Sequence, residues 1–295
     1  MEYVVETNAL VKKYGQKAAV DNMSVHVRKG DIYGLIGKNG AGKTSLMKLL
    51  LGLTIPNSGE IKLFGSTDLG AARMRIGSLI EAPAIYKNET AMENLARFSL
   101  LAPTSKNRMH ELLELVGLGD VGKKKAGAFS LGMRQRLGIA IALLGDPELL
   151  ILDEPINGLD PAGIKEIRDL IVEMNRRGTT FMISSHLLDE LGKIATNYGI
   201  AHEGVLEEIT AEELQRKCRV SLKLGVSDPA KAQELIRASF PELQTHIEGG
   251  KLHILSDVND PAALNRALVM ADIGVYELAG EGTGMEDFFI ERLGR

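Results

Sequence analysis

The chain has 295 residues, of which 44% are hydrophobic and 25% charged, and its formal net charge is −4 at pH 7. These values are typical of a soluble globular protein with one large or two ordinary domains. The slight acidic excess gives no sign of a general nucleic-acid surface, so no nucleic-acid partner is expected.

The N-terminal residues read as β-structure. Residues 4–10 and 19–27 alternate loosely between apolar and polar side chains, and residues 12–15 are expected to form the turn between them. Tyr14 lies in this turn. It is either an aromatic platform for a nucleotide base or a turn tyrosine packed on the sheet edge, and these residues alone favour neither.

Residues 37–44 fit the pattern G-x-x-x-x-G-K-[ST] of a phosphate-binding P-loop. Its glycines let several backbone N–H groups approach one anion, Lys43 adds charge on the β- and γ-phosphates, and the Thr44 hydroxyl can hold Mg²⁺. An apolar strand at 31–36 and a helix at 45–51 give the order that the motif needs. The residues expected to bind the nucleotide here are Gly37, Lys38, Asn39, Gly40, Ala41, Gly42, Lys43, Thr44 and Ser45.

The middle of the chain changes from strands to helices. Short strands are expected at 59–65 and 75–81, and the second ends on the acidic Glu81. Beyond residue 90, apolar side chains recur at three- and four-residue spacing, which is the period of a helix. Three helices are expected, at 91–101, 106–116 and 131–144. Residues 85–145 therefore look like an all-helical insertion in a β/α chain.

Residues 149–155 read Leu-Leu-Ile-Leu-Asp-Glu-Pro and indicate a central parallel strand buried on both faces. Its carboxylates emerge at the carboxyl end, where open α/β sheets bind ligands. Asp153 can anchor Mg²⁺ through its water shell, and Glu154 can polarise a water molecule. A pair of solvated acids is the alternative, and the P-loop upstream argues against it.

A helix at 161–177 and a strand at 179–184 follow this strand. Asp160 is the expected N-cap of the helix, with Pro161 in its first turn. His186, just after the strand at 179–184, can contact a γ-phosphate, although a lone histidine at a strand end is more often structural. The other five histidines are scattered and suggest no metal cluster.

The tail beyond about residue 218 has a different pattern of expected strands and helices. The expected elements are a strand at 220–226, a helix at 229–240, a hairpin of 243–247 and 251–255, a helix at 261–271 and a strand at 274–279. This β-α-β-β-α-β order is that of a small ferredoxin-like unit. A last helix at 285–293 is expected to pack back on the first domain. The tail is either a dimer-stabilising or regulatory appendage or a structural extension with no ligand.

Five motifs in order give the chain a family resemblance. They are the P-loop, residues 129–136 (Phe-Ser-Leu-Gly-Met-Arg-Gln-Arg), residues 149–155, residues 157–160 (Asn-Gly-Leu-Asp) and residues 184–186 (Ser-Ser-His). Over about residues 1–215 the chain resembles ATP-binding-cassette ATPases. Residues 80–83 (Ile-Glu-Ala-Pro) and 130–133 (Ser-Leu-Gly-Met) are similar to single-cassette subunits of bacterial bacitracin and lantibiotic exporters.

The resemblance implies an α/β P-loop NTPase with a β-subdomain and a helical insertion, and it implies a role for each site residue. Tyr14 would stack on adenine, and the P-loop would bind the phosphates of ATP. Mg²⁺ would be held by Thr44 and, through water, by Asp153. Glu154 would be the general base for the attacking water, and His186 would sense the γ-phosphate.

The resemblance also implies a homodimer that sandwiches two ATP molecules. Ser130 and Gly132 would contact the ATP bound to the opposite subunit, and Asp160 would communicate across that interface. Two positions depart from the family pattern. Glu81 replaces the usual glutamine, and Ser-Leu-Gly-Met at 130–133 replaces Ser-Gly-Gly-Gln. A carboxylate near phosphates is repelled unless Mg²⁺ lies between them, so Glu81 is expected to be a metal neighbour.

The function expected is that of an ATP-hydrolysing subunit that drives a separate membrane permease and exports, or gives resistance to, peptide antibiotics. The longest apolar run, about 137–145, is too short to cross a bilayer, and the single cysteine, Cys218, favours a reducing compartment. The chain is therefore expected in the cytoplasm. The resemblance implies that it lies peripherally on the inner face of the cell membrane, with the permease bound at about 82–105. Residues 1–215 would form the ATPase domain and 216–295 an accessory domain.

Two alternatives belong to other functional classes. A soluble cassette ATPase could act in translation or repair without a permease, but such relatives usually carry two cassettes or long coiled coils, and this chain has neither. A nucleotide-binding scaffold that scarcely hydrolyses ATP is disfavoured by the intact Glu154.

Overall fold

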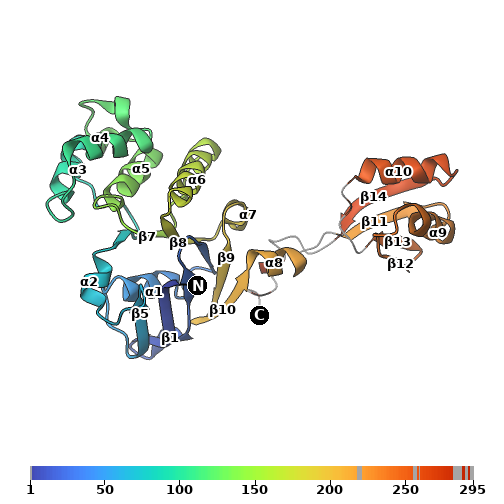
Figure 1. Cartoon of the computed structure of the whole chain (residues 1–295), viewed down its shortest axis with the longest axis horizontal. Helices are drawn as coiled ribbons and strands as arrows, with labels where there is room; N and C mark the ends of the chain where they lie inside the picture. The colour runs from blue at the N-terminus through green and yellow to red at the C-terminus, as the bar shows by residue number, and fades with distance from the viewer. Residues whose placement is uncertain are drawn as a thin grey trace. The chain divides into compact units, whose positions relative to one another are not determined.

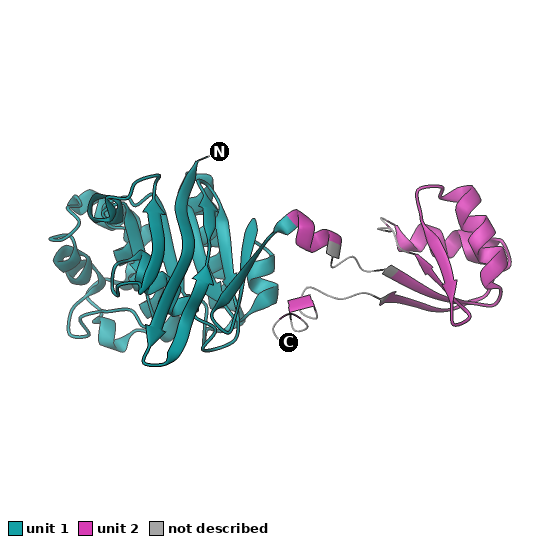
Figure 2. Ribbon diagram, turned by 90° about the horizontal axis from the view of Figure 1, so that it is seen from below, with its two compact units in different colours: residues 1–211 teal, residues 212–295 magenta. Residues whose placement is uncertain are grey.

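The computed structural model describes residues 2–217, 221–254, 258, 260–281, 288, 289 and 292. The chain divides into two compact units, Met1–Ala211 and Glu212–Arg295 (Figure 2). The division falls a few residues before position 215, where the sequence places the domain boundary. Each unit has a sheet and a hydrophobic core of its own.

An antiparallel sheet opens the first unit. Its strands are β1 (Tyr3–Tyr14), β2 (Lys17–Met23), β3 (His26–Arg28) and β5 (Ser58–Leu63), and β1 pairs with each of the other three. The prediction of a turn at residues 12–15 is wrong. The last three residues of β1 still pair with β2, so the turn falls at residues 15–16, where Gly15 has a left-handed φ of 61°.

The central sheet of the first unit has six strands in the order β10-β9-β4-β8-β7-β6. They are β4 (Ile32–Ile36), β6 (Ile76–Leu79), β7 (Leu149–Asp153), β8 (Thr180–Ser185), β9 (Asn197–His202) and β10 (Val205–Thr210). All neighbouring pairs are parallel except β9 and β10. Every residue of β4, β7 and β8 is buried, which explains their mostly apolar sequences. Because these strands are parallel, the residues that follow them meet at one edge of the sheet.

The elements of the first unit that were not expected from the sequence include β9, β10 and the short helix α7 (Leu188–Gly192). Half of the residues of β10 are exposed, and its apolar and charged residues do not alternate clearly along the strand. β9 is mostly buried and lies between β4 and β10 in the sheet. Helix α7 has no side-chain cap. Local sequence signals are weak in all three, and pairing with distant segments decides their structure.

The helical group lies between β6 and β7 in the chain (Figure 1). It contains α3 (Ala91–Phe98), α4 (Lys106–Leu115), the 3₁₀ turns η1 (Gly119–Val121) and η2 (Ala126–Ala128), and α5 (Leu131–Ala142). Thr90, Ser105 and Ser130 cap the three α-helices, each accepting a hydrogen bond from a backbone N–H of the first turn. The expected helical insertion is confirmed, although each helix ends one to three residues earlier than expected.

Three further helices pack around the sheets of the first unit: α1 (Lys43–Leu50), α2 (Leu69–Arg73) and α6 (Pro161–Arg176). The core joins the antiparallel sheet, α1 and the central sheet, and it includes Val5, Met47, Leu63 and Ile151. Helix α6 begins as expected, because the Asp160 side chain accepts a hydrogen bond from the backbone N–H of Gly163 and a proline occupies the first turn.

The second unit begins within α8 (Ala211–Lys217) and contains a four-stranded antiparallel sheet in the order β12-β13-β11-β14. Its further elements are β11 (Ser221–Val226), α9 (Pro229–Ser239), β12 (Thr245–Glu248), β13 (Lys251–Ile254), α10 (Pro261–Met270) and β14 (Val275–Glu281). This is the β-α-β-β-α-β order of the expected ferredoxin-like unit. Most of the helix expected at 285–293 lies outside the described residues.

The packing of β6 against α5 can be tested at Gly77. A Cβ at this position would lie 1.9 Å from the backbone oxygen of Ala142 and 3.0 Å from Cγ of Pro147. Because a backbone atom cannot rotate away, Gly77→Ala is expected to lower the free energy of unfolding by about 3 kcal/mol. Gly70→Ala is the matched control, since its Cβ would meet only Asp68 Oδ1, at 3.5 Å. Urea denaturation with equal midpoints for both variants would contradict this packing.

Candidate functional site

The P-loop connects β4 to α1 at the carboxyl edge of the central sheet. Gly42, the last residue before α1, has a left-handed φ of 105°. A Cβ on Gly42 would lie 2.1 Å from the backbone oxygen of Ala19, and one on Gly37 would lie 2.4 Å from that of Ala201. The loop therefore packs closely against both β2 and β9. Close backbone contacts require glycine at both positions, and at Gly42 the left-handed conformation requires it as well.

Lys43 places its ammonium group among oxygen atoms inside the loop. The side chain is only 6% exposed. Its Nζ donates hydrogen bonds to the backbone oxygens of Gly37, at 2.6 Å, and Lys38, at 3.4 Å. Nζ also lies 3.7 Å from Oε1 of Glu154. The Lys43 side chain thus lies within the loop, where phosphate binding is expected.

Asp153 joins the P-loop to the end of β7. Its carboxylate is 3% exposed, and its two oxygens have different partners. Oδ2 accepts a hydrogen bond of 2.8 Å from the Thr44 hydroxyl, and Oδ1 accepts one of 2.5 Å from the Ser184 hydroxyl. Thr44 and Asp153 are far apart in the sequence and meet here as the two oxygen donors expected to hold Mg²⁺.

Mg²⁺ commonly takes only one or two protein ligands, with water and substrate phosphates completing its shell. The pair Thr44 and Asp153 fits this donor set. Within the described part of the chain, no group of three or more histidine, cysteine or acidic residues could hold a metal ion by itself. The two oxygen donors present therefore suit Mg²⁺ bound together with a nucleotide.

Glu154 lies between the lysine of the P-loop and the histidine that follows β8. Its Oε2 is 2.7 Å from Nδ1 of His186, and its Oε1 is the atom near Lys43. Its φ is 49°, which is uncommon for a residue other than glycine. Ser184 stabilises this backbone, because the Glu154 N–H donates to the Ser184 hydroxyl at 2.9 Å and to the Ser184 carbonyl at 3.2 Å. Strained backbone of this kind clusters at functional sites.

Two further predicted residues lie apart from this cluster. Tyr14 is 51% exposed at the end of β1, with Nζ of Lys12 5.2 Å from the centre of its ring. Glu81 has a φ of 60° and accepts a hydrogen bond of 2.7 Å from Nζ of Lys48 on α1. This hydrogen bond raises the pKa of Lys48. The observed partner of Glu81 is thus a lysine rather than Thr44 or Asp153, and its metal role stays a prediction.

Ser130 and Gly132 lie at the start of α5, and Asp160 caps the start of α6 in the same unit. Ser130 accepts from the backbone N–H of Met133 and caps α5. A Cβ on Gly132 would lie 3.6 Å from Cδ2 of Leu159, and one on Gly158 would lie 3.0 Å from Cδ2 of Leu131. The segments 130–133 and 157–160 therefore pack on each other. Their contacts to ATP on an opposite subunit stay a prediction.

A hollow of about 390 Å³ lies beside the P-loop. Its lining residues are Lys17, Ala18, Lys38, Asn39, Gly40, Ala41, His202 and Glu203. His202 and Glu203, at the β9–β10 turn, were missed from the sequence because neither strand was expected. Ser184 was missed as a positioning residue although it lies in the quoted Ser-Ser-His motif, since nothing local shows that its hydroxyl faces Asp153.

Comparison with known proteins decides the family. A sequence model described as "ABC transporter" matches residues 20–157. The bacitracin transport ATP-binding protein BcrA of Bacillus licheniformis is 42% identical over 302 residues, which cover 100% of this chain and 98% of that protein. The chain belongs to the ABC transporter ATP-binding proteins. The lantibiotic transport ATP-binding protein SrtF of Streptococcus pyogenes is 45% identical over 66% of this chain and 85% of its own.

A solved structure agrees with this assignment. The ADP conformation of the ATP-binding cassette MJ1267 has a TM-score of 0.67 at 26% identity, covering 74% of this chain and 94% of that one. The expected P-loop NTPase fold of the ABC type is confirmed. The expectation that the chain is an ABC ATPase that binds ATP is also confirmed. No helix in the described part of this ABC ATPase is both long and apolar enough to cross a membrane.

Ser184 offers a test of how this ABC ATPase positions its two acidic residues. Ser184→Ala removes the hydroxyl that bonds both Asp153 Oδ1 and the Glu154 N–H. The expected result is a fall in kcat for ATP hydrolysis of about tenfold, with the fold intact. Ser185→Ala is the control, because the Ser185 hydroxyl accepts only from the Leu187 N–H in the described contacts. A steady-state phosphate-release assay in which both variants match wild type would refute the positioning role.

Proposed function

We propose that this chain is the ATP-hydrolysing subunit of a membrane exporter, which dimerises on binding ATP and drives a separate permease. The observation that carries the proposal is the continuous set of contacts from Thr44 through Asp153 and Ser184 to Glu154 and His186. They support the proposal because the proposed metal ligands, the candidate base and the candidate phosphate sensor are linked to one another beside one P-loop.

The chemistry of the proposed reaction is phosphoryl transfer to water, which needs positioning and electrostatic stabilisation more than covalent catalysis. The backbone N–H groups of residues 37–45 would cradle the phosphates, with Lys43 on the β- and γ-oxygens. Glu154 would accept a proton from the attacking water, and His186, 2.7 Å from it, would orient the carboxylate and contact the γ-phosphate. Thr44 and, through water, Asp153 would hold Mg²⁺, which would supply positive charge beside the phosphates.

The proposed active form is a homodimer. Ser130 and Gly132 would contact the ATP held by the P-loop of the opposite subunit, and Asp160 would lie at the interface. Tyr14, half exposed, would stack on the adenine. Since ATP would contact both subunits only in the closed dimer, ATP binding stabilises that state, and hydrolysis releases it.

The proposed substrate class is peptide antibiotics of the bacitracin or lantibiotic type, moved outward or expelled as resistance. This rests on the names of the relatives, above all the bacitracin transport protein BcrA, which matches this chain over nearly the full length of both proteins. The subunit would then lie in the cytoplasm on the inner face of the cell membrane, with the permease contact at about 82–105. A soluble ATPase that acts without a permease remains the competing function.

Glu154→Gln tests the reaction and the partner together. Loss of the general base is expected to lower the rate of ATP hydrolysis by about 10²–10⁴-fold while ATP still binds. The ATP-bound dimer should then accumulate, and size-exclusion chromatography with ATP and Mg²⁺ would measure it.

The same Glu154→Gln variant, tagged and expressed in the native host, should co-purify one multi-span membrane protein in stoichiometric amount from detergent-solubilised membranes. That protein would be the permease, and its transmembrane segments would set the substrate. Ribosomes, DNA or no membrane protein at all, despite ATP-dependent dimerisation, would reject the transporter and leave only the ATPase.

Glu81→Gln tests the proposed metal neighbour. If the carboxylate acts on Mg²⁺, the concentration of Mg²⁺ needed for half-maximal ATPase activity should rise, because an amide attracts the cation less strongly than a carboxylate. Lys48→Gln is the control, since it breaks the 2.7 Å pair with Glu81 and leaves the carboxylate in place. Equal behaviour of both variants, with unchanged transport, would make Glu81 a partner of Lys48 and nothing more.

A further inference from the structure

The hollow of about 390 Å³ beside the P-loop is formed by three segments of the first unit. Lys17 and Ala18 come from β2, residues 38–41 from the P-loop, and His202 and Glu203 from the end of β9 and the turn after it. This volume is within the ~300–1,000 Å³ of small-molecule sites. The P-loop supplies only part of the lining, so the other two segments can contact whatever extends from phosphates bound there.

Tyr14 lies next to one wall of this hollow. β1 and β2 are antiparallel, and Tyr14 lies directly opposite Lys17 in their register. Residues directly opposite each other in an antiparallel pair share one face of the sheet, with Cβ atoms ~4.5–5.5 Å apart. Lys17 lines the hollow, and the Tyr14 side chain is half exposed. A nucleotide with its phosphates on the P-loop and its adenine on Tyr14 would therefore place its ribose in the hollow.

Glu203 and Gly204 form the two-residue turn between β9 and β10. His202 and Val205 pair across it, and the two turn residues have left-handed φ values of 47° and 86°. Turns with positive φ at both central residues strongly favour Asn-Gly, Asp-Gly or Gly-Gly, because the first residue must tolerate this conformation. A glutamate here is strained, and strained residues cluster at functional sites.

Gly204 fixes this turn between the P-loop and β2. Its N–H donates to the Ala41 carbonyl at 3.3 Å, and its carbonyl accepts from the Asp21 N–H at 2.6 Å. Gly204 is buried, whereas Glu203 beside it is exposed and lines the hollow. The backbone of the turn is therefore held in place, and the Glu203 side chain is the part of the turn that a ligand in the hollow can meet.

The contacts of the chain do not explain a glutamate at this position. Within the described part of the chain, the Glu203 carboxylate takes part in no hydrogen bond or ion pair. Lys17 and Lys38 also line the hollow and favour an anionic ligand, and Glu203 is the only acid among the lining residues. A carboxylate weakens the binding of nearby phosphates unless it accepts hydrogen bonds from the same ligand. Glu203 therefore requires a ligand that offers donors close to its phosphates.

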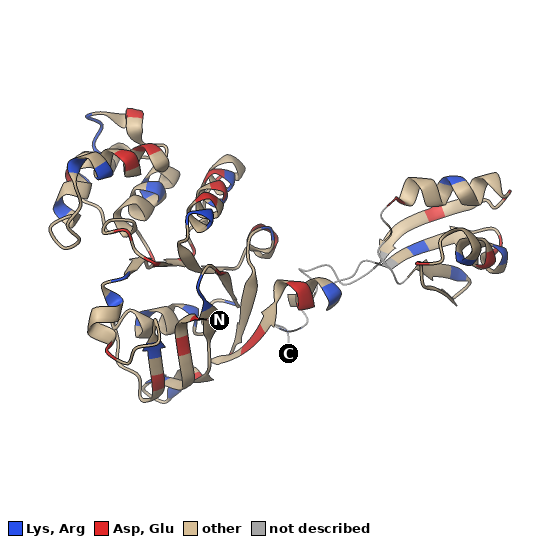
Figure 3. Cartoon of the chain, viewed as in Figure 1, with Lys and Arg blue, Asp and Glu red and all other residues tan. Residues whose placement is uncertain are grey.

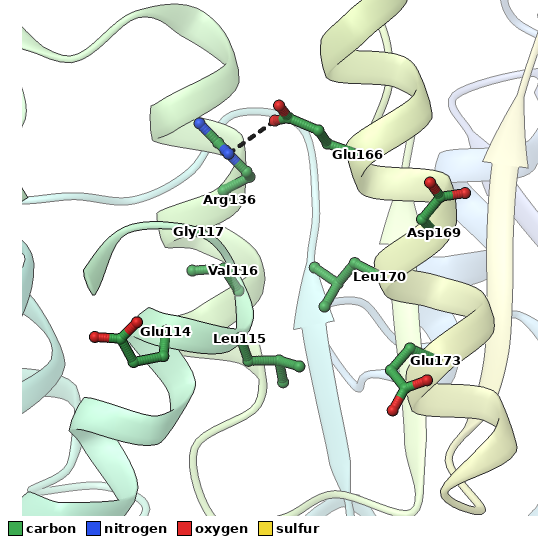
Figure 4. Close-up of a pocket in the computed structure, with 9 residues that line it drawn as sticks. All are labelled: Glu114, Leu115, Val116, Gly117, Arg136, Glu166, Asp169, Leu170 and Glu173. Atoms are coloured by element: carbon green, nitrogen blue, oxygen red, sulfur yellow. Dashed lines mark hydrogen bonds and ion pairs between the residues drawn. The ribbon is translucent and has the colours of Figure 1, made fainter. Parts of the chain in front are cut away.

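A groove of about 450 Å³ between α4 and α6 shows the opposite situation (Figure 4). Its Arg136 is bonded to Glu166 at 2.8 Å, and Glu173, which also lines the groove, pairs with Arg177. Several acidic residues lie on α6 (Figure 3). None of the residues lining this groove belongs to the P-loop. Glu173 is therefore a suitable control position for the removal of a carboxylate.

We infer that Glu203 accepts hydrogen bonds from the ribose hydroxyls of the bound nucleotide and makes this ABC ATPase prefer ribonucleotides to 2′-deoxyribonucleotides. The inference rests on the proposed function, because it takes the adenine to stack on Tyr14. An ionised carboxylate only accepts hydrogen bonds, and the 2′- and 3′-hydroxyls are two neighbouring donors that its two oxygens can bind together. An acidic residue contacts the ribose 2′-hydroxyl in dinucleotide-binding folds in the same way.

Glu203→Gln tests the inference, with Glu173→Gln as the matched control. Isothermal titration calorimetry of the full chain with Mg²⁺ would give Kd for ATP and for 2′-deoxy-ATP. Wild type and the control are expected to bind ATP about tenfold more tightly than 2′-deoxy-ATP, because the deoxynucleotide loses a hydrogen bond to a charged group. In Glu203→Gln this preference should fall to about threefold or less, since an amide is a weaker acceptor. No preference in wild type, or an unchanged preference in Glu203→Gln, would overturn the inference.

Glu203→Asn separates the ligand contact from the folding of the turn. Asparagine tolerates positive φ and is the residue that such a turn favours, so the midpoint of urea unfolding without nucleotide should rise. Its side chain is shorter and uncharged, so ATP and 2′-deoxy-ATP should bind with nearly equal affinity. A lower midpoint, with weaker binding of both nucleotides, would show that the glutamate serves the turn itself and would reject the ribose contact.

Two further measurements separate the possible failures. Inosine triphosphate keeps the ribose and lacks the amino group of adenine. If Glu203→Gln changes the affinity for ATP relative to inosine triphosphate instead, the carboxylate contacts the base and the ribose inference is wrong. Tyr14→Ala should weaken ATP and 2′-deoxy-ATP by the same factor. If it weakens neither, the proposed adenine stacking fails, whereas an unchanged ribose preference in Glu203→Gln rejects this inference alone.

Discussion

The buried carboxylate of Asp153 is the group on which the rest of the site depends. A carboxylate that is 3% exposed is costly unless each oxygen is hydrogen-bonded, and here hydroxyl groups of Thr44 and Ser184 meet that requirement. These two bonds tie the start of α1 and the end of β8 to the end of β7. The same Ser184 hydroxyl accepts from the Glu154 N–H, so one residue positions both the Asp153 carboxylate and the Glu154 backbone.

Parallel pairing explains why such distant segments meet. β4, β8 and β7 are neighbours in the sheet, and all three end at the same edge. The P-loop, the histidine after β8 and the two acids at the end of β7 therefore converge there. Backbone contacts hold the P-loop in place from both sides, since a Cβ on Gly42 or Gly37 would strike β2 or β9. The helical group is connected to this edge through β6 and β7, so the sheet that supports the P-loop also supports the helical group.

The fold and most of the site were predictable because their signals are local. The P-loop glycines, the buried apolar strands and the capped helices each depend on residues close in sequence. The ABC family motifs then identified Thr44, Asp153, Glu154 and His186, which the structure brings together. The turn after β1 was misplaced because the last β1 residues are polar and pair with β2 all the same. β9 and β10 were missed because their strand structure depends on neighbours in the sheet.

The sequence by itself determined the chemistry: a loop that binds phosphate, two acids at a strand end, and the family to which such motifs belong. Only the tertiary structure decided which atoms meet. Ser184 as the link between the acids, Lys48 as the partner of Glu81, and the groove between α4 and α6 all join residues that are far apart in the chain. Side-chain direction and the packing of one element on another create these contacts, and neither is encoded in a local pattern.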